Sequence, residues 1–392
     1  MLAAHREWIR RVMYAPKLPL KKGERDALKT MPSVVGRHTL PLFVVPPAGD
    51  FDHELGHIPT PAEHVKAFGK KLFDCRNARP VFIDAVLLDD ARHRVESDVH
   101  PLTALLERAR LCKAQAWPMT GFNRSDEYQE AVARFHLRHD VPIAIQVGLA
   151  ELEAADLSAK LISLCNQVSC DPTDAVLVID AGPLHIPAAA ESEFVSHLIV
   201  RLNEIPRLYE WCGVVLCATS LSSPVKLKND EQKTIRRVEW HIHRLLCERR
   251  REIYRIPIFS DYGVDYFQKL VPNKASPVAK INYSTDEDYV YFKGQSVKTA
   301  SYEAIFAVAE AVVASGHYKG GNFSLGDARI GLWSNKVGST GNAPTWRWAA
   351  LDHHFTLVGQ LLALESGVFI DDHTERPGNA EQLDLVSLIP GK

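Results

Sequence analysis

The segment Ala175-Val-Leu-Val-Ile-Asp180 consists of five apolar residues followed by an aspartate. An uninterrupted apolar run of this length is typical of a strand that is buried on both faces of a parallel sheet. Two further segments end in the same way, Val81-Phe-Ile-Asp84 and Ile258-Phe-Ser-Asp261. Because aspartate is disfavoured inside strands, an aspartate at the end of a buried strand indicates a cap or a functional group. These three strand ends are therefore the first candidates for functional residues.

The strand-like pattern occurs eight times in the 392 residues, and helical patterns fill most of the intervals. The predicted strands span residues 14–21, 39–45, 80–87, 116–121, 142–149, 175–180, 213–219 and 256–261. The clearest helical patterns span residues 61–73, 101–112, 126–136, 152–164, 191–202 and 231–250. Strands and helices that alternate eight times predict a closed α/β barrel, the TIM-like (β/α)8 fold, and an open doubly wound sheet is the alternative.

The pattern changes after the eighth strand. The following elements are predicted there: two short strands around an acidic turn (280–292), a helix (302–315), a stretch rich in Gly, Asn and Ser (317–344) and a last amphipathic helix (345–364). We therefore predict a barrel with a β-hairpin insert after the eighth strand over residues 1–316. A C-terminal extension with a polar tail is predicted to pack on this barrel over residues 317–392.

The composition excludes some classes of function. With 46% hydrophobic and 24% charged residues and a net charge of −2, the chain has no general attraction for nucleic acid or for an anionic membrane. The seven cysteines are scattered without a Cys-x-x-Cys pair, which indicates free buried thiols in a reducing compartment. Apolar runs stay well short of the ~18 residues that span a bilayer, and no glycine-rich nucleotide loop follows a strand. We therefore expect a cytoplasmic protein without a membrane partner, and leave a role of nucleic acid open.

One short motif matches a metal site literally. His53-Glu-Leu-Gly-His57 has the H-E-x-x-H pattern, in which a helix presents two His ligands to zinc and the Glu acts as general base. The segment lies between Pro46-Pro47 and Pro59, and it contains Gly56, so a helix here would be about two turns at most. We interpret it as a loop with exposed His, and a zinc metalloprotease is the alternative.

The strand ends supply a second candidate site. Asp84, Asp180 and Asp261 end the third, sixth and eighth predicted strands, and Lys21 ends the first. In a (β/α)8 barrel the carboxyl ends of all strands open onto the face where ligands bind. Converging carboxylates can hold a divalent metal or act as acid and base, and a lysine beside them can bind phosphate. We therefore predict these four residues as catalytic candidates. The alternative is that each aspartate caps the loop after its strand.

Other polar and aromatic residues have weaker assignments. Gln146 ends another predicted strand and adds a hydrogen-bonding group. His353 and His354 are neighbours in the last helix, and neighbours on a helix point in different directions. We therefore expect one of the two to pack in the interior and the other to reach the site. Trp346 and Trp348 are expected to be core residues rather than a platform for bases.

Several segments, taken in order along nearly the whole chain, resemble the phage Beta protein family. They are Tyr14-Ala-Pro with Lys21-Lys-Gly-Glu24, Phe-Ser-Asp261-Tyr262, Lys280-Ile-Asn-Tyr283-Ser-Thr-Asp286, Phe323-Ser-Leu-Gly326-Asp327, and Trp346-Arg347 with His353-His354. One departure is Ser260, which stands where the family has glycine. The resemblance implies that Glu24, Tyr262, Tyr283, Arg347, His353 and His354 are binding residues, and it includes Lys21 and Asp261.

The resemblance also implies a genetic setting. Members of that family occur in satellite phages, prophages and bacterial defence islands, and the founding member is encoded beside a growth-arresting gene in a cassette that excludes other phages. We therefore predict an anti-phage defence component that binds or senses a phage or host component, or restrains a toxic protein partner from the same cassette. The alternative is a barrel enzyme, a metal-assisted hydrolase of a phosphodiester or related substrate. The sequence leaves open whether the protein is an enzyme and whether it has a cofactor; the hydrolase alternative would use a divalent metal.

Overall fold

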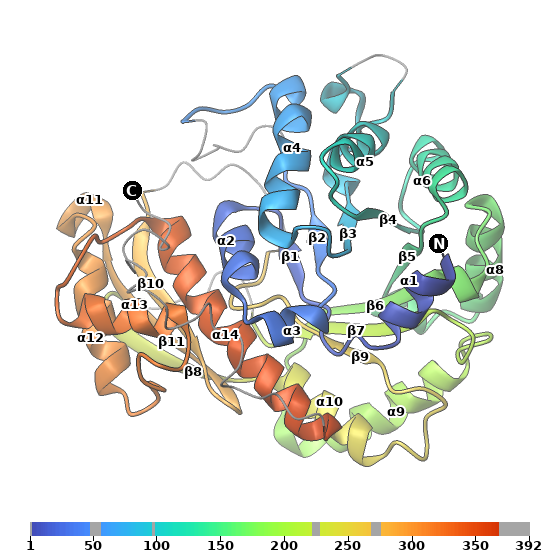
Figure 1. Ribbon diagram of the computed structural model, residues 1–392. Coiled ribbons are helices and arrows are strands. Elements are labelled where there is room, and N and C mark those ends of the chain that lie inside the picture. Colours follow the sequence, from blue (N-terminus) through green and yellow to red (C-terminus); the bar gives the residue numbers. More distant parts are fainter. Residues whose placement is uncertain (1, 48–55, 96–98, 222–227, 268–275, 368–392) are drawn as a thin grey trace.

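The computed structural model describes residues 2–47, 56–95, 99–221, 228–267 and 276–367. Eight parallel strands form one sheet in the order β1-β2-β3-β4-β5-β6-β7-β9 (Figure 1). Their bounds are β1 Lys17–Pro19, β2 Leu42–Val44, β3 Val81–Asp84, β4 Ala116–Gly121, β5 Ile143–Gly148, β6 Ala175–Pro183, β7 Gly213–Thr219 and β9 Ile258–Ser260. Each of the eight overlaps one predicted strand, and β6 continues three residues beyond the predicted end at Asp180.

The last strand returns to the first, so the sheet closes. Tyr14 forms parallel bridges to both Thr39 and Phe259. The backbone N–H of Ala15 donates to Phe259 O at 2.9 Å, and that of Lys17 donates to Asp261 O at 2.8 Å. This closure confirms the (β/α)8 prediction and excludes the open doubly wound sheet.

Helices surround the barrel (Figure 1). Their bounds are α1 Leu2–Ile9, α2 Lys22–Thr30, α3 Ser33–Arg37, α4 Pro61–Arg76, α5 Pro101–Leu111, α6 Asp126–His139, α7 Leu149–Leu152, α8 Leu157–Gln167, α9 Glu191–Asn203 and α10 Val238–Glu248, with the 3-10 turns η1 Val86–Leu88, η2 Ala91–His93, η3 Pro172–Asp174 and η4 Ala188–Ala190. Capping fixes several starts: Thr60 and Glu63 form a capping box at α4, and Ser125 caps α6. Ile9 at the end of α1 lies against Gly213, so α1 closes the amino end of the barrel.

Side chains along the strands alternate between two hydrophobic clusters. The cluster inside the barrel contains Leu42, Phe82, Trp117, Met119, Ala144, Val176, Val178, Val215 and Cys217. The cluster between the barrel and the helices contains Phe43, Ile83, Ile145, Leu177, Ile179 and Leu216. Successive residues of a strand point to opposite faces, so the sequence position of a strand residue decides which cluster it joins.

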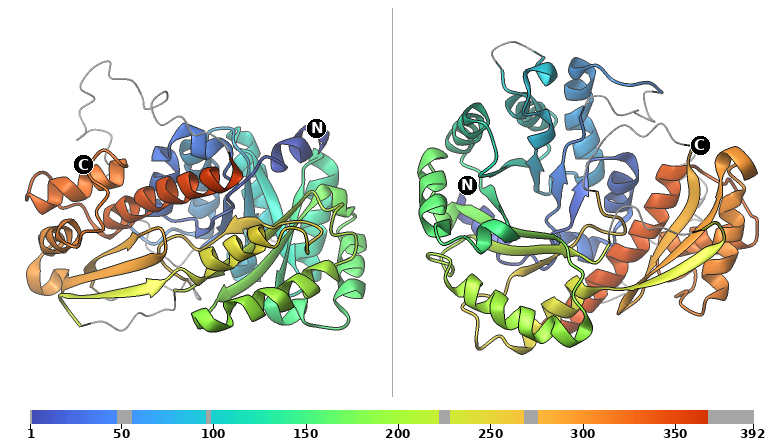
Figure 2. Two further views of the ribbon diagram at one scale, coloured as in Figure 1. Left: turned by 90° about the horizontal axis from the view of Figure 1, so that it is seen from below. Right: turned by 180° about the vertical axis from the view of Figure 1, so that it is seen from behind.

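A second, antiparallel sheet lies to one side of the barrel (Figure 2). Its order is β10-β11-β8, with bounds β8 Glu231–Arg236, β10 Val278–Ser284 and β11 Asp288–Ser296. The predicted hairpin at 280–292 is confirmed. The prediction of one helix over 231–250 is wrong in its first turn and a half, because residues 231–236 pair with β11 and the helix begins only at Val238. Strand pairing with β11, which is distant in the sequence, overrides the local helical pattern of residues 231–236.

Four helices complete the C-terminal layer: α11 Val297–Ala300, α12 Ala304–Ala314, α13 Leu325–Ser334 and α14 Ala343–Ser366. The predicted helices 302–315 and 345–364 correspond to α12 and α14. The stretch 317–344 was predicted without a helix but contains α13, which begins where Ser324 Oγ accepts from Asp327 N. α14 runs along the junction between the barrel and the second sheet (Figure 1). Among helices of the described residues, none combines the length and the apolarity that a membrane crossing requires.

A buried polar network attaches α14 to both sheets. His354 Nε2 lies 2.9 Å from Asp261 Oδ2, and Tyr14 OH donates to Asp261 Oδ1 at 2.6 Å. The other ring nitrogen of His354 lies 2.7 Å from Ser284 Oγ. A neutral ring that donates from Nε2 and accepts at Nδ1 satisfies both partners, and burial lowers the pKa of His354 accordingly. The hydrogen bonds from His354 and Tyr14 outweigh the effect of burial and hold the pKa of Asp261 below its usual range.

The neighbouring His353 requires a different protonation state. Its Nδ1 lies 2.8 Å from Asp327 Oδ2, and its Nε2 lies 2.8 Å from the carbonyl oxygen of Ser284. Both partners are acceptors, so His353 donates from both nitrogens and is an imidazolium with Asp327 as counter-ion. Asp327 also accepts from Tyr283 OH at 2.6 Å. Both histidines are fully buried and both contact Ser284. Neither ring lies at the surface, and the expectation that one of them reaches a ligand site stays a prediction.

A third carboxyl group lies one residue before this pair. Asp352 is 1% exposed and accepts from Thr30 Oγ1 at 2.5 Å and from the backbone N–H of Gly326 at 2.8 Å. Within the described part of the chain, both partners of this carboxyl are neutral, and burial raises the pKa of Asp352 to about 6. Trp348, which is fully buried as predicted, donates to Thr30 at 2.9 Å and completes this contact between α14 and α2.

We expect Asp327→Asn to lower the free energy of unfolding by about 3–5 kcal/mol, because it leaves a buried imidazolium without its counter-ion. The matched control is Asp286→Asn, which removes an exposed carboxylate that pairs with Lys319 at 3.0 Å. This control should cost less than about 1 kcal/mol. Urea denaturation of the full chain measures both, and equal losses in the two variants would contradict the assignment of charge to His353.

Asp352 predicts a pH dependence with a definite sign. Its pKa in the folded protein is raised from 3.8 to about 6, so the folded state binds the proton more tightly than the unfolded state. The free energy of unfolding should therefore fall as pH rises from about 4 to about 6, by about 2–3 kcal/mol relative to Asp352→Asn. Denaturant titrations of both proteins across this range give the difference. A difference that is constant with pH would show that Asp352 does not titrate there.

Candidate functional site

The inside of the barrel turns polar at the carboxyl ends of the strands. The residues that face each other there are Lys17, Asp84, Gln146, Asp180 and Tyr262, with Arg124 from the loop after β4, and we call them the mouth cluster. They continue the inward-facing positions that are apolar deeper in the barrel. Ligands bind at this end in (β/α)8 barrels, so the mouth cluster is the candidate functional site.

Lys17 is the centre of the cluster. Its Nζ lies 2.5 Å from Asp180 Oδ2 and donates to Gln146 Oε1 at 3.0 Å. Tyr262 OH donates to the other oxygen of Asp180 at 2.6 Å, and the ammonium lies 5.5 Å from the centre of the Tyr262 ring. The side chains of Lys17 and Asp180 are only 7% and 11% exposed, so this ion pair is largely desolvated.

Burial and charge fix the protonation of these groups. Burial alone lowers the pKa of Lys17, but the surrounding negative charges, that of Asp180 foremost and that of Asp84 as well, act together with the hydrogen bond to Asp180 and raise this pKa above its usual value. Burial and Asp180 together hold the pKa of Tyr262 well above its usual value. The site therefore presents an ammonium and a phenol around a carboxylate. Burial also keeps the nearby thiol of Cys217 protonated by raising its pKa.

Asp84 has a cation of its own. Arg124 donates to Asp84 Oδ2 at 2.8 Å, and both side chains are 2% exposed. Tyr128 OH lies 3.4 Å from the other oxygen of Asp84. The mouth cluster thus contains two cations and two carboxylates in two separate ion pairs.

The three strand-end aspartates share one structural feature. Each accepts a hydrogen bond from the backbone N–H two residues later: Val86 to Asp84 at 3.0 Å, Gly182 to Asp180 at 3.1 Å, and Gly263 to Asp261 at 2.9 Å. This is the cap geometry that was the alternative interpretation of these residues. In Asp84 and Asp180 the second oxygen remains available to a cation at the mouth.

Asp261 does not join the other two. Ser260 and Tyr262 face the inside of the barrel, so Asp261 between them faces outward and enters the buried network with Tyr14 and His354. Lys21 is also displaced from its predicted place. β1 ends at Pro19 and Lys21 is the N-cap residue of α2, so the lysine that reaches Asp180 is Lys17. Catalytic roles for Lys21, Asp84, Asp180 and Asp261 stay predictions, but only Asp84 and Asp180 lie at the mouth.

The remaining predicted binding residues lie at the junction with the C-terminal layer, except Tyr262. Arg347 pairs with Asp265 at 2.7 Å and with the buried Glu24 at 3.3 Å. Lys280 reaches the same Asp265 at 2.9 Å. Tyr283 belongs to the network around Asp327. These residues hold elements together, and any role in binding stays a prediction.

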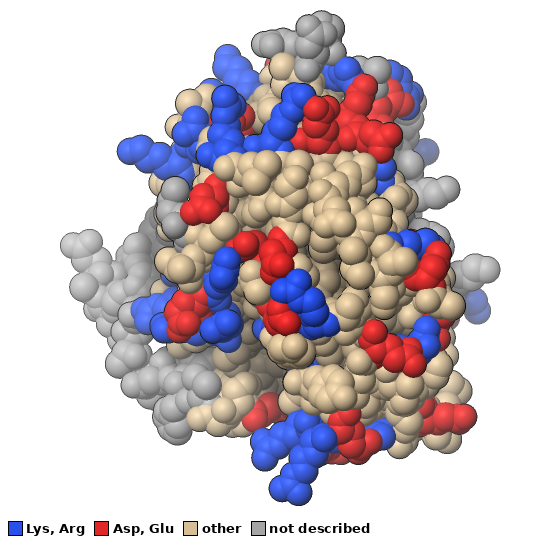
Figure 3. Space-filling model, turned by 90° about the vertical axis from the view of Figure 1, so that its right-hand side faces the viewer, with Lys and Arg blue, Asp and Glu red and all other residues tan. Residues whose placement is uncertain are grey.

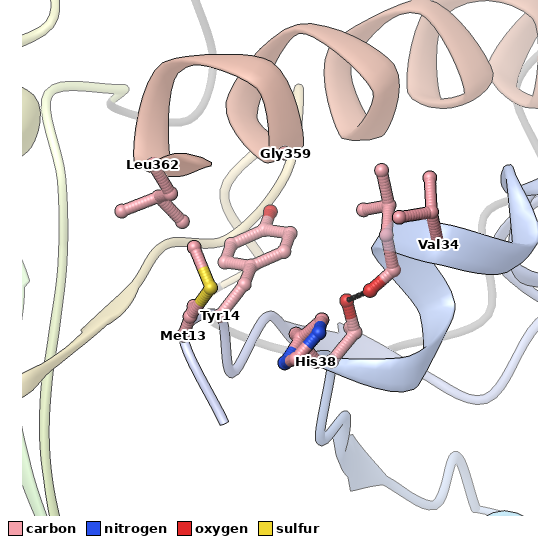
Figure 4. Close-up of a pocket in the computed structure, with 8 residues that line it drawn as sticks. Met13, Tyr14, Val34, His38, Gly359 and Leu362 are labelled. Carbon is pink, nitrogen blue, oxygen red and sulfur yellow. Dashed lines mark hydrogen bonds between the residues drawn. The ribbon is translucent and has the colours of Figure 1, made fainter. Parts of the chain in front are cut away.

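One pocket away from the mouth cluster is too small to hold more than a water molecule. This small apolar pocket between α3, α14 and the first strand, lined by Tyr14, His38 and Leu362 among others, has a cavity volume of about 20 Å³ (Figure 4). That is room for one water molecule. On the face shown in Figure 3, Lys and Arg are interspersed with Asp and Glu, as the small net charge suggests.

The H-E-x-x-H segment lies mostly outside the described residues, which omit its first three positions and resume at Gly56. His57 is exposed, with its Nε2 3.4 Å from Glu63 Oε1. Glu63 also closes the capping box of α4 with Thr60. The zinc interpretation of this segment therefore stays a prediction.

Sequence reasoning missed Lys17 and Arg124. Lys17 lies within the predicted first strand, and its inward direction follows from alternation with Ala15, which belongs to the inner cluster. The alternation gives the direction of Lys17 only when the register between the first and the last strand is known. Arg124 lies in a loop after β4, and no sequence pattern indicated that it would turn back to Asp84.

Comparisons with known proteins give a match to a family and matches to solved structures. The model of the Beta protein family matches residues 14–360, from the first strand through most of α14. Solved structures also match, among them triosephosphate isomerase from Bartonella henselae, at 10% identity with a TM-score of 0.34, over 64% of this chain and 92% of that chain. No curated protein matches the chain significantly. Because the family match includes the barrel, the mouth cluster and the buried histidine network, the chain belongs to the Beta protein family.

Proposed function

We propose that this protein is an anti-phage defence component that acts by binding, and that the mouth cluster is its binding site. The defence role is supported by membership in the Beta protein family together with the genetic setting described above. The ligand in this proposal is a polar group of a phage or host component, or of a toxic protein partner encoded in the same cassette.

The observation that carries the binding role is the pairing of charges at the mouth. Lys17 has Asp180, and Arg124 has Asp84, so each carboxylate already has a cation at hydrogen-bonding distance. Such a site is electrically balanced before a ligand arrives. A polar ligand can replace one partner in an ion pair. Binding then moves the side chain of Lys17 or Arg124, and the surrounding loops can transmit this movement.

The alternative, a metal-assisted hydrolase, has one observation in its favour. Asp84 and Asp180 both face the inside of the barrel at its carboxyl end, where such enzymes place their metal ligands. However, two carboxylates that hold a divalent metal have to give up their present cations. Asp261, the third candidate, faces the C-terminal layer instead. The hydrolase therefore requires a larger rearrangement than the binding site does.

The double variant Lys17→Met/Asp180→Asn tests the proposal. It removes both charges, so neither is left buried without a partner, and Asn keeps an acceptor for Tyr262 OH. We expect the free energy of unfolding to stay within about 2 kcal/mol of wild type. Protection against phage should fall at least tenfold, since each charge-assisted hydrogen bond to a ligand contributes about 1.5–3 kcal/mol. Plaque counts on cells that carry the complete cassette measure this.

The matched control is Lys319→Met/Asp286→Asn, which makes the same chemical change in an exposed ion pair of 3.0 Å. It should leave protection unchanged. Full protection by the mouth variant would contradict the proposal. A purified wild-type protein that cleaves a phosphodiester reporter with added Mg²⁺ or Mn²⁺, with the activity lost in Asp84→Asn, would establish the hydrolase instead.

A further inference from the structure

Three potential metal ligands meet on the side of the barrel, away from the mouth cluster. His243 and Cys247 lie one turn apart on α10, and Glu365 lies in the last turn of α14. One ligand atom of each residue lies within 4.8 Å of the other two. Among the described residues, no other group of three His, Cys, Asp or Glu side chains is this close. The cluster takes no part in the function proposed above.

The spacing of the first two ligands fits a tetrahedral metal. His243 Nε2 lies 3.6 Å from Cys247 Sγ. A tetrahedral zinc with Zn–S of about 2.3 Å and Zn–N of about 2.0–2.1 Å has an S···N edge of about 3.5–3.6 Å. Residues four apart on a helix lie on the same face, so α10 presents both ligands in one direction. These two ligand atoms therefore need no movement toward each other to bind the ion.

The ring of His243 is held in place. It stacks on Trp240 with ring centres 5.7 Å apart and tilts against Phe259 at 5.2 Å. Burial lowers the pKa of His243 to about 4, which keeps the imidazole neutral as a metal ligand must be. A ligand that is fixed in direction and already deprotonated loses little on binding a metal.

Glu365 brings the third ligand from the other helix. Its side chain is 27% exposed, a carboxylate oxygen lies within 4.8 Å of the ligand atoms of His243 and Cys247, and its Oε1 lies 3.5 Å from Arg244 Nε. Arg244 has a second carboxylate partner, Glu287, at 2.9 Å. Arg244 can therefore release Glu365 to a metal without losing its last ion pair. The exposed side of the cluster leaves room for water as a fourth ligand.

We propose that His243, Cys247 and Glu365 form a binding site for a thiophilic divalent metal, with Zn²⁺ as the ion that fits best. A thiolate with an imidazole and a carboxylate suits zinc and excludes Mg²⁺ and Ca²⁺, which take oxygen ligands. Binding forms the Zn–S bond as the S–H bond of Cys247 breaks, and the proton passes to solvent.

The site joins α10 of the barrel to the end of α14. α14 also carries Asp352, His353 and His354, which attach the C-terminal layer. A metal at this point is therefore a second attachment of the same helix, at its opposite end from Arg347. Zinc should raise the midpoint of thermal unfolding of the full chain, because it binds only the state in which the two helices are together.

Titration of the chelator-treated full-length protein with Co²⁺, in a reductant without thiols, tests the site. We expect one equivalent to give visible bands of tetrahedral cobalt and a near-ultraviolet thiolate charge-transfer band, and Zn²⁺ to remove both. Cys247→Ser should lose the thiolate band. Glu365→Gln should weaken affinity by at least the 10–100-fold that loss of an outer-sphere partner costs.

The matched control is Cys112→Ser, which removes another half-buried thiol at the end of α5. It should leave the spectrum and affinity of wild type intact, and circular dichroism of the metal-free variants checks that each is folded. The proposal is overturned if wild type gives no thiolate band, if Cys112→Ser loses the band as Cys247→Ser does, or if cobalt binds with a nitrogen and oxygen spectrum alone. The last result would place the metal elsewhere in the chain.

Discussion

Alternation of side chains along the strands is the constraint on which this structure depends. In a closed barrel one face of every strand points inward and the other points to the helices. Asp84 and Asp180 occupy inward positions and meet cations at the mouth. Asp261 occupies an outward position and meets His354. Three aspartates that look alike in the sequence therefore lie in two different environments, because Asp261 points outward whereas Asp84 and Asp180 point into the barrel.

Outward-facing polar side chains of the barrel form a junction through which the C-terminal layer is attached. α14 is buried over most of its length, and its buried residues Asp352, His353, His354 and Thr356 each have hydrogen-bond partners. His353 and His354 contact the same Ser284, one at its carbonyl and one at its hydroxyl, and this fixes different protonation states in neighbouring rings. Removing one partner leaves a buried group unsatisfied at a cost of several kcal/mol. The family signature in this region thus coincides with a structural network.

Much of the fold was predictable because strands buried on both faces have a strong apolar signal. This signal and the alternation with helical patterns predicted all eight barrel strands, and the acidic turn between two short strands predicted the β10–β11 hairpin. β8 did not, because its residues 231–236 are mostly exposed and form a strand only through pairing with β11. α13 did not, because its signal is a single Ser324 cap within a Gly-rich stretch.

The candidate site was only partly predictable. The strand ends pointed to Asp84, Asp180 and Gln146, which do lie at the mouth. The choice of Lys21 over Lys17 assumed that the first strand continues to the end of its apolar pattern. Strand length inside a barrel is set by pairing with its neighbours. The pairing with β2 ends at Pro19, and the last hydrogen bond runs from Leu20 N to Val44 O, one residue before Lys21.

Two variants that each lose one tyrosine hydroxyl test most directly whether the inward-facing residues bind and the outward-facing residues stabilise the fold. Tyr262 donates to Asp180 on the inside and Tyr14 donates to Asp261 on the outside, each at 2.6 Å. Free energies of unfolding and phage protection, corrected for the amount of folded protein, are measured for Tyr262→Phe and Tyr14→Phe. We predict that Tyr14→Phe loses about 1–3 kcal/mol of stability and keeps protection, whereas Tyr262→Phe loses protection. Lost protection in Tyr14→Phe together with full protection in Tyr262→Phe would contradict the account.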